Sequence, residues 1–205
     1  MDTNLQKINE IIQMGYTKLE EENVKDACTI WMKAWESLKR VIHVKKFTSI
    51  EEIDDEFEGY ESLENWCQDF EMELENAASL NKEFYKIRIR YCMEFYNLLP
   101  DSDEFIILNM KLAEAESYFE IGSIMTSEKI FESAAEEFND YAWVYIKWGD
   151  VYWLSNILKK QRELIDFDKA EKIYREGLNK GLEDEYILED RLNDLLEAKE
   201  KLSLK

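Results

Sequence analysis

The chain has 205 residues, enough for one domain of ordinary size with a substantial core. Apolar residues make up 45% of it and charged residues 35%, while only six Gly and one Pro interrupt it. This composition excludes a disordered chain and argues against a β-protein, which needs frequent turn residues. The formal net charge of −20 argues against direct binding to nucleic acid, because phosphates would be repelled.

Neither the first residues of the sequence nor its cysteines suggest export or a membrane. The first residues, MDTNLQKINEII, lack the basic and apolar segments of a secretory signal, and no run reaches the roughly 18 apolar residues of a membrane span. Cys28, Cys67 and Cys92 are widely spaced within helical patterns, so we expect buried, reduced thiols and no metal site. These features predict a cytoplasmic protein.

Residues 1–46 predict a first helix pair. The segment ACTIWMKA (27–34) places a small residue, Ile, an aromatic and a second small residue at i, i+3, i+4 and i+7, which is one face of a helix. Gly15 lies twelve residues before Ala27, on the preceding predicted helix. Small residues on both helices predict a close crossing, with the ring of Trp31 filling the space beside it.

Residues 47–100 form an atypical acidic segment followed by a second predicted helix pair. Ser49 and Glu52 have the spacing of a capping box, which predicts that a helix starts there. Seven acidic and no basic residues lie between positions 51 and 61, so we expect a solvated, partly frayed negative edge. The rest of the region predicts two long helices that break near residues 76–81.

The helical pattern of the first pair recurs twice. In residues 101–141 it reads SEKIFESA, with Ala115 standing twelve residues before its first small residue. In residues 142–180 it reads AEKIYREG, but Gly149 stands 21 residues before it, so about nine residues are inserted between these two helices. The second of them is expected to begin near Asp166 or Asp168, both good N-cap residues.

The spacing of these segments resembles the tetratricopeptide repeat. Ala115 to Gly149 is 34 residues, and the repeat is a 34-residue helix–turn–helix unit with small residues at its eighth, twentieth and twenty-seventh places. The match is imperfect, because Lys18 stands where an aromatic is usual and Lys111 and Glu114 stand where bulky residues are usual. The resemblance implies an all-α, right-handed stack of antiparallel helix pairs over residues 1–205, with a capping helix in residues 181–205.

A second likeness covers roughly residues 110–154. The phrases AEAESYFEIGS and FNDYAWVYIKWGDVYWLS look like helical segments of bacterial proteins that carry a short SEC-C-type zinc motif at the C-terminus. This sequence ends KEKLSLK and lacks that cysteine-rich motif, so no zinc site carries over. The likeness favours the helical stack and implies no activity.

No motif points to catalysis or to a cofactor. His43 is the only His and lies at the end of a helical pattern, which disfavours both a catalytic triad and a di-metal carboxylate site. The sequence has no Gly-rich phosphate loop, G-x-S-x-G elbow or H-E-x-x-H zinc motif, and its acidic runs lack calcium-loop spacing. We therefore expect a protein that is not an enzyme and holds no cofactor or metal.

The resemblance also implies a binding face. In tetratricopeptide repeats the first helix of each pair lines the concave side, and the matching positions here are aromatic and acidic. The candidate residues are Tyr16, Asn109, Glu116, Phe119, Trp143, Asp150 and Trp153. Such a face suits a partner segment with apolar anchors and Lys or Arg. The Lys, Asn and Arg clamp that other repeats use for acidic C-terminal peptides is absent, and helical spacing alone equally allows the two Trp residues to be buried.

The most specific prediction concerns Asp150. Trp143 and Trp153 lie seven and three residues away, on the same side of one helix. A carboxylate between two indoles can hold a cation through its charge and through the ring faces. We therefore predict that a Lys or Arg of the partner docks beside Asp150. The alternative is that Asp150 caps or bridges to a neighbouring helix.

Two classes of function remain open at this point. The leading hypothesis is a non-catalytic module that holds a basic and apolar protein segment on its concave face. The alternative is an acidic decoy, which imitates nucleic acid and blocks a nucleic-acid-binding protein; a weaker third is the interaction half of a separate effector. A decoy needs carboxylates spaced along one convex or edge surface, whereas a binding groove needs carboxylates beside exposed aromatic residues.

Overall fold

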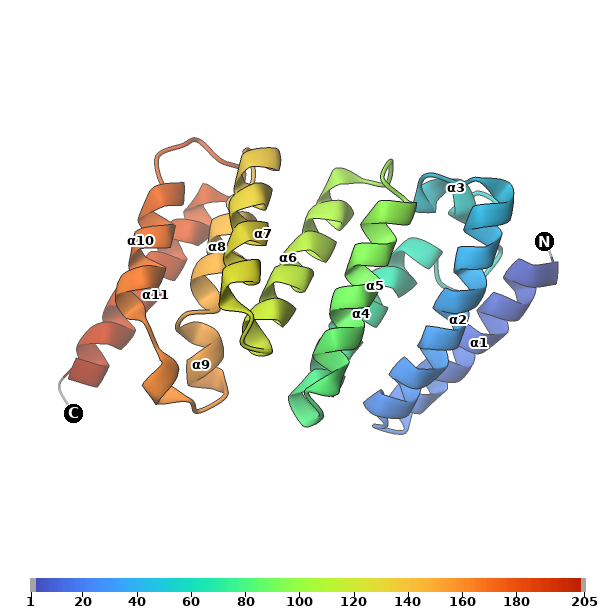
Figure 1. Ribbon diagram of the computed structural model, residues 1–205, viewed down its shortest axis with the longest axis horizontal. Helices are drawn as coiled ribbons and strands as arrows, with labels where there is room; N and C mark the ends of the chain where they lie inside the picture. Colours follow the sequence, from blue (N-terminus) through green and yellow to red (C-terminus); the bar gives the residue numbers. More distant parts are fainter. Residues whose placement is uncertain (1–2, 204–205) are drawn as a thin grey trace. The chain divides into compact units, whose positions relative to one another are not determined.

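The computed structural model describes residues 3–203, and all regular structure in that range is helical (Figure 1). The predicted all-α class is therefore confirmed. The chain divides into two compact units, Met1–Ser117 and Tyr118–Lys205. The first unit contains α1 (Thr3–Glu20), α2 (Val24–Lys45), α3 (Ile50–Asp54), α4 (Leu63–Leu80), α5 (Glu83–Leu98) and most of α6 (Glu104–Glu120). The second contains α7 (Ile124–Glu137), α8 (Trp143–Asp150), α9 (Leu154–Leu158), α10 (Phe167–Gly177) and α11 (Glu185–Ser203).

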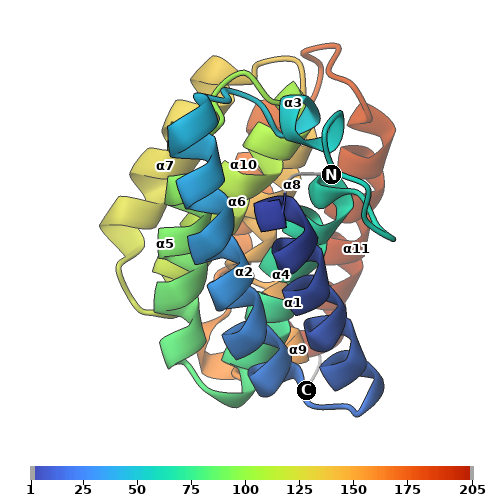
Figure 2. The same ribbon diagram turned by 90° about the vertical axis from the view of Figure 1, so that its right-hand side faces the viewer.

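The predicted close crossing of the first two helices is present. Helices α1 and α2 run antiparallel and side by side in both views (Figures 1 and 2). A Cβ atom on Gly15 would lie only 2.0 Å from the indole of Trp31, so only Gly leaves room for that ring. The buried indole Nε1 also donates a hydrogen bond to the carbonyl oxygen of Ile12 at 3.0 Å.

Large aromatic side chains fill the core of the first unit. The rings of Trp66 and Phe70 on α4 stack with centroids 5.9 Å apart, and the Trp31 indole meets the Phe70 ring edge-on at 5.8 Å. Tyr91 on α5 packs against Phe70 and donates its hydroxyl hydrogen to a backbone carbonyl of α4 at 2.9 Å. The thiol of Cys28 lies in this interior, and burial raises its pKa to about 12. The predicted burial of all three cysteines is confirmed.

The acidic segment 51–61, which includes most of α3 and ends just before α4, has a structural use as well as a solvated face. Ser49 and Glu52 form the predicted capping box at the start of α3. The Asp54 carboxylate accepts the backbone N–H groups of Leu63 at 2.6 Å and Glu64 at 3.0 Å, at the start of α4. Negative charge stabilises a helix N-terminus. Some of the carboxylates of residues 51–61 therefore stabilise the N-termini of α3 and α4.

The second unit repeats the crossing seen in the first. A Cβ atom on Gly149 of α8 would lie 2.0 Å from the ring of Tyr174 on α10, and one on Gly177 would lie 2.6 Å from the ring of Tyr145. The insertion between these helices consists of α9 and a 3₁₀ turn at Arg162–Leu164. Asp166 caps α10 by accepting the backbone N–H of Lys169 at 2.9 Å, as predicted.

Candidate partner-binding site

The first unit carries a cleft of about 610 Å³ between α1, α4 and the loop that precedes α4. We call it the acidic cleft. Its lining residues are Gln13, Tyr16 and Glu20 from α1, Tyr60 and Glu61 from the loop, and Asn65, Gln68 and Asp69 from α4. Spacings of three, four and seven residues place each helix's contributions on one helical face. The lining therefore combines aromatic, amide and acidic side chains.

Tyr16 joins the two helical walls of the acidic cleft. Its hydroxyl donates a hydrogen bond to the Asp69 carboxylate at 2.7 Å. Burial raises the pKa of Tyr16, and the hydrogen bond to the Asp69 carboxylate raises it further. The phenol therefore stays protonated and keeps its donor role. The ring of Tyr16 also meets the indole of Trp31 edge-on at 4.9 Å, which fixes its orientation against the core.

The acidic cleft lacks a positive charge of its own. Three of its eight lining side chains, Glu20, Glu61 and Asp69, are carboxylates, and none is Lys or Arg. Tyr60 is 86% exposed, which leaves an aromatic ring in solvent at the edge of the carboxylates. The buried Nε2 of Gln13 has no hydrogen-bond partner among the described residues.

The second unit holds a similar set of aromatic and acidic groups, but here a Lys of the chain itself contacts them. The Glu128 carboxylate accepts hydrogen bonds from the Trp148 indole and the Tyr152 hydroxyl, both at 2.6 Å. The Lys169 ammonium donates to the same carboxylate at 2.6 Å and lies 5.7 and 5.6 Å from the two ring centroids. We call these four residues the lysine cage. Burial opposes the charge of Glu128, yet hydrogen bonds from Lys169, Tyr152 and Trp148 hold its pKa below the usual value.

The structure places Asp150 in the alternative, structural role. Its carboxylate accepts a hydrogen bond from the Tyr174 hydroxyl at 2.5 Å and forms an ion pair with Arg191 of α11 at 3.3 Å. Trp153 is only 3% exposed, and its indole donates to the same Tyr174 hydroxyl at 2.6 Å. Trp143 is half-buried and donates to Asp184 at 3.2 Å. Trp153 is therefore a buried side chain, and Asp150 already has partners on α10 and α11, whereas Trp143 stays partly exposed. That a partner cation docks beside Asp150 stays a prediction.

Three of the remaining predicted residues lie on α6 and do not line the acidic cleft. Glu116 on α6 accepts a hydrogen bond from Arg88 at 3.2 Å, Asn109 is half-buried on the same helix, and the ring of Phe119 meets that of Tyr152 edge-on at 5.0 Å. Of the seven candidates, Tyr16 alone lines the acidic cleft. The other seven lining residues are not among those candidates. The run of acids that ends in Tyr60 and Glu61 was the available signal for two of them.

Arg88 forms the most deeply buried charged group of the first unit. It is 2% exposed and contacts the carboxylates of Glu71 and Glu75 on α4 and of Glu116 on α6. Its guanidinium also donates to the Ser117 hydroxyl at 3.2 Å. Burial disfavours the charge, but the three carboxylates hold the pKa of Arg88 above its usual value. This cluster ties α4, α5 and α6 together.

Comparisons of the chain with models of protein families, with curated proteins and with solved structures find no match in any of the three. Within residues 3–203, no three His, Cys, Asp or Glu side chains are grouped so as to hold a metal ion. No helix of the described chain has both the length and the apolar character needed to cross a membrane.

Proposed function

We propose that this chain is a non-catalytic protein-interaction module that binds a basic and apolar segment of a partner protein in the acidic cleft. One observation carries the proposal. The cleft gathers two Tyr rings and three carboxylates, and no Lys or Arg of the chain lines it. Where the same chemistry occurs in the lysine cage, an internal Lys occupies it.

The binding mode follows from the groups in the cleft. A Lys or Arg of the partner would lie against Asp69 and Glu61, with the ring of Tyr60 beside it. A cation–π contact contributes about 0.5–2 kcal/mol, and more when water is excluded. An apolar side chain of the partner would cover the exposed Tyr60 ring.

We further propose that the helix pairs belong to a tetratricopeptide-like right-handed stack. Two pairs support this architecture, because Gly15 receives Trp31 and Gly149 receives Tyr174 with the same close approach. In such repeats the first helix of each pair lines the binding face, and α1 supplies Tyr16 to the acidic cleft. The three buried thiols are compatible with a reducing compartment, and we propose the cytoplasm.

Photo-crosslinking tests the proposed site. A photoreactive phenylalanine analogue replaces Tyr60 in the acidic cleft and, as a matched control, Tyr186, which is 64% exposed on α11. We expect position 60 to capture a partner whose crosslinked segment, read by mass spectrometry, contains Lys or Arg beside apolar residues. Equal capture at both positions, or a segment without basic residues, contradicts the proposal.

The same experiment distinguishes the proposed interaction module from the alternative function, an acidic decoy. A decoy would capture a nucleic-acid-binding protein at position 60, and added DNA or RNA would displace it. The structure favours the cleft over the decoy in one respect, because Glu52 and Asp54 of the acidic run bind backbone N–H groups. These carboxylates are less available for an extended negative surface.

A further inference from the structure

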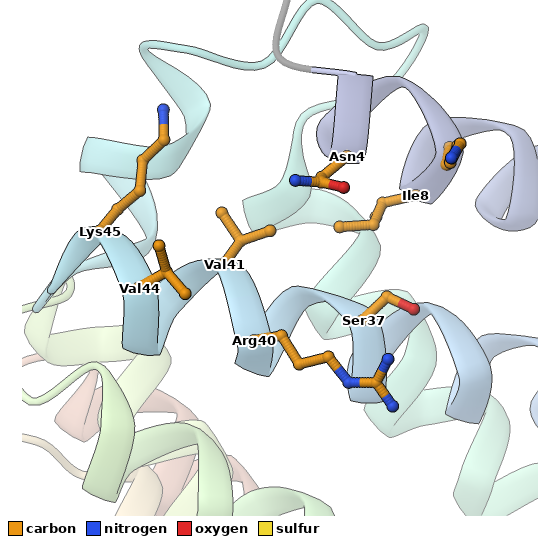
Figure 3. Close-up of a pocket in the computed structure, with 8 residues that line it drawn as sticks. Asn4, Ile8, Ser37, Arg40, Val41, Val44 and Lys45 are labelled. Carbon is orange, nitrogen blue, oxygen red and sulfur yellow. The ribbon is translucent and has the colours of Figure 1, made fainter.

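A second pocket of the first unit has the opposite charge. It measures about 420 Å³ and lies between the N-terminal half of α1 and the C-terminal half of α2 (Figure 3). We call it the basic pocket. Its lining residues are Asn4, Lys7 and Ile8 from α1 and Ser37, Arg40, Val41, Val44 and Lys45 from α2. Three of them are basic and none is acidic, in a unit whose sequence has 26 acidic and 13 basic residues.

The unpaired cations are unusual in so acidic a unit. Lys45 pairs with Glu56, but neither Lys7 nor Arg40 has a carboxylate partner among the described residues. The helix dipole does not account for either of them. Basic side chains gain from the dipole in the last turn of a helix, whereas Arg40 lies before the last turn of α2 and Lys7 lies in the first half of α1.

The pocket also has an apolar floor between its charged ends. Ile8 and Val41 are almost fully buried and face each other across the opening, while Val44 is 77% exposed and forms an open wall (Figure 3). The side chain of Lys45 rises at one end, and Arg40 extends along α2 toward Ser37 at the other (Figure 3). A ligand that fits must therefore present an apolar group between two negative charges.

We propose that the basic pocket docks an extended, acidic segment of a second protein, with an aliphatic side chain flanked at alternate positions by Asp or Glu. Alternate residues of an extended chain point to the same side and are about 6.6 Å apart, so two acids and the central aliphatic group can face the pocket together. The aliphatic side chain packs on Ile8, Val41 and Val44. One flanking carboxylate pairs with Arg40 or Lys7, and the other competes with Glu56 for the ammonium of Lys45.

The open wall favours a protein segment over a small molecule. Sites for small molecules enclose most of the ligand surface, whereas Val44 leaves one side of this pocket in solvent. A second copy of this chain is disfavoured as the occupant, because two chains of charge −20 repel each other. This site is separate from the acidic cleft, so each can fail without the other.

A defined probe tests the proposal on the full chain. The probe is a fluorescent heptapeptide with a glutamate at each alternate position beside a central leucine; one control peptide has glutamines instead, and another has alanine for the leucine. We expect saturable binding of the first peptide and binding at least fivefold weaker for both controls. Equal binding of the glutamine peptide overturns the proposal, and so does no binding at all.

Protein variants locate the binding. Arg40→Glu and Lys7→Glu should each weaken the probe by about fivefold or more, because each reverses a charge at the pocket. Lys33→Glu, an exposed position of α2 outside the pocket, should change the affinity less than twofold, as should Asp69→Asn in the acidic cleft. Equal effects of Arg40→Glu and Lys33→Glu would indicate attraction by overall charge and overturn the site. Sedimentation of the chain alone must show a monomer, since a dimer abolished by Arg40→Glu identifies a second copy as the occupant and overturns the proposal.

Discussion

The lysine cage of the second unit and the acidic cleft of the first contain the same kinds of group in two different states. In the cage, Glu128, Trp148 and Tyr152 surround the ammonium of Lys169. In the cleft, the carboxylates and the Tyr rings have no basic neighbour among the lining residues. The presence of carboxylates beside aromatic rings therefore does not identify a binding site. The deciding feature is whether the chain supplies its own cation.

Arg88 extends this comparison into the core, where loss of the internal cation should have the largest effect. We expect Arg88→Met to lower the free energy of unfolding by about 3–5 kcal/mol, because it leaves buried carboxylates without their shared partner. Urea unfolding followed by circular dichroism measures the change. Lys86→Met on the exposed face of α5 is the control and should cost less than about 1 kcal/mol. Similar losses for the two variants would contradict the buried role of Arg88.

The helix crossings of the two units should respond alike to overpacking. Gly15→Ala and Gly149→Ala each place a Cβ atom about 2.0 Å from an aromatic ring, so a helix must shift. We expect each substitution to lower the free energy of unfolding by about 1–3 kcal/mol. Thermal unfolding measures this, with Lys25→Ala at an exposed position of α2 as a control that should change the stability little. If either Gly→Ala variant unfolds with the wild-type free energy, the two helices pack less closely than the 2.0 Å approach indicates.

Removal of the cation from the lysine cage should have a smaller effect. Lys169→Met keeps most of the aliphatic side chain but removes the charge, and we expect a loss of about 1 kcal/mol at pH 7, since the ion pair is partly exposed. Lys172→Met, an exposed position on the same helix, should have almost no effect. Unfolding curves of the two variants test this difference.

The cage should also depend on pH in a defined direction. The pKa of Glu128 is lower in the folded chain than its ordinary value near 4.3, so its contribution is complete above that pH. The contribution is lost as the pH falls through the lower, folded pKa. The stability difference between the wild type and Lys169→Met should therefore shrink below about pH 4. A difference that stays constant down to pH 3 would show that Lys169 acts through packing instead.

The local features of the fold were predictable because they depend on residues close together in sequence. The Ser49 capping box and the Asp166 cap follow from spacings of a few residues, and the aromatic residue beside Gly15 follows from the patterns of two consecutive helices. The all-α class follows from the same spacings with the shortage of Gly and Pro. Neither needs any knowledge of how distant segments meet.

The candidate site was mostly not predictable, because it depends on contacts between distant segments. Nothing near Asp150 in the sequence shows that Tyr174 and Arg191 reach it. The acidic cleft takes five of its residues from positions 60–69, where the helical repeat is irregular and no repeat position could be assigned. From the sequence, an aromatic and acidic face is expected around Asp150 in the second unit, whereas the acidic cleft of the structure lies in the first unit.

A cation built into the acidic cleft should convert it to the state of the lysine cage. Gln68→Lys adds an ammonium beside Asp69 and Glu61, and we expect it to raise the free energy of unfolding by no more than about 0.5 kcal/mol. The control, Asn76→Lys, adds the same charge at an exposed position of α4 outside the cleft. This change in stability is the smallest of those predicted, but the same two variants also test binding.

The most direct test of the proposed function is the yield of photo-crosslinking from position 60 in three backgrounds: wild type, Gln68→Lys and Asn76→Lys. Our account predicts that a partner is captured by the wild type and by Asn76→Lys, and that capture falls at least tenfold in Gln68→Lys, because the internal Lys competes for the carboxylates. Capture that is equal in all three backgrounds would contradict the claim that the acidic cleft binds a cationic segment.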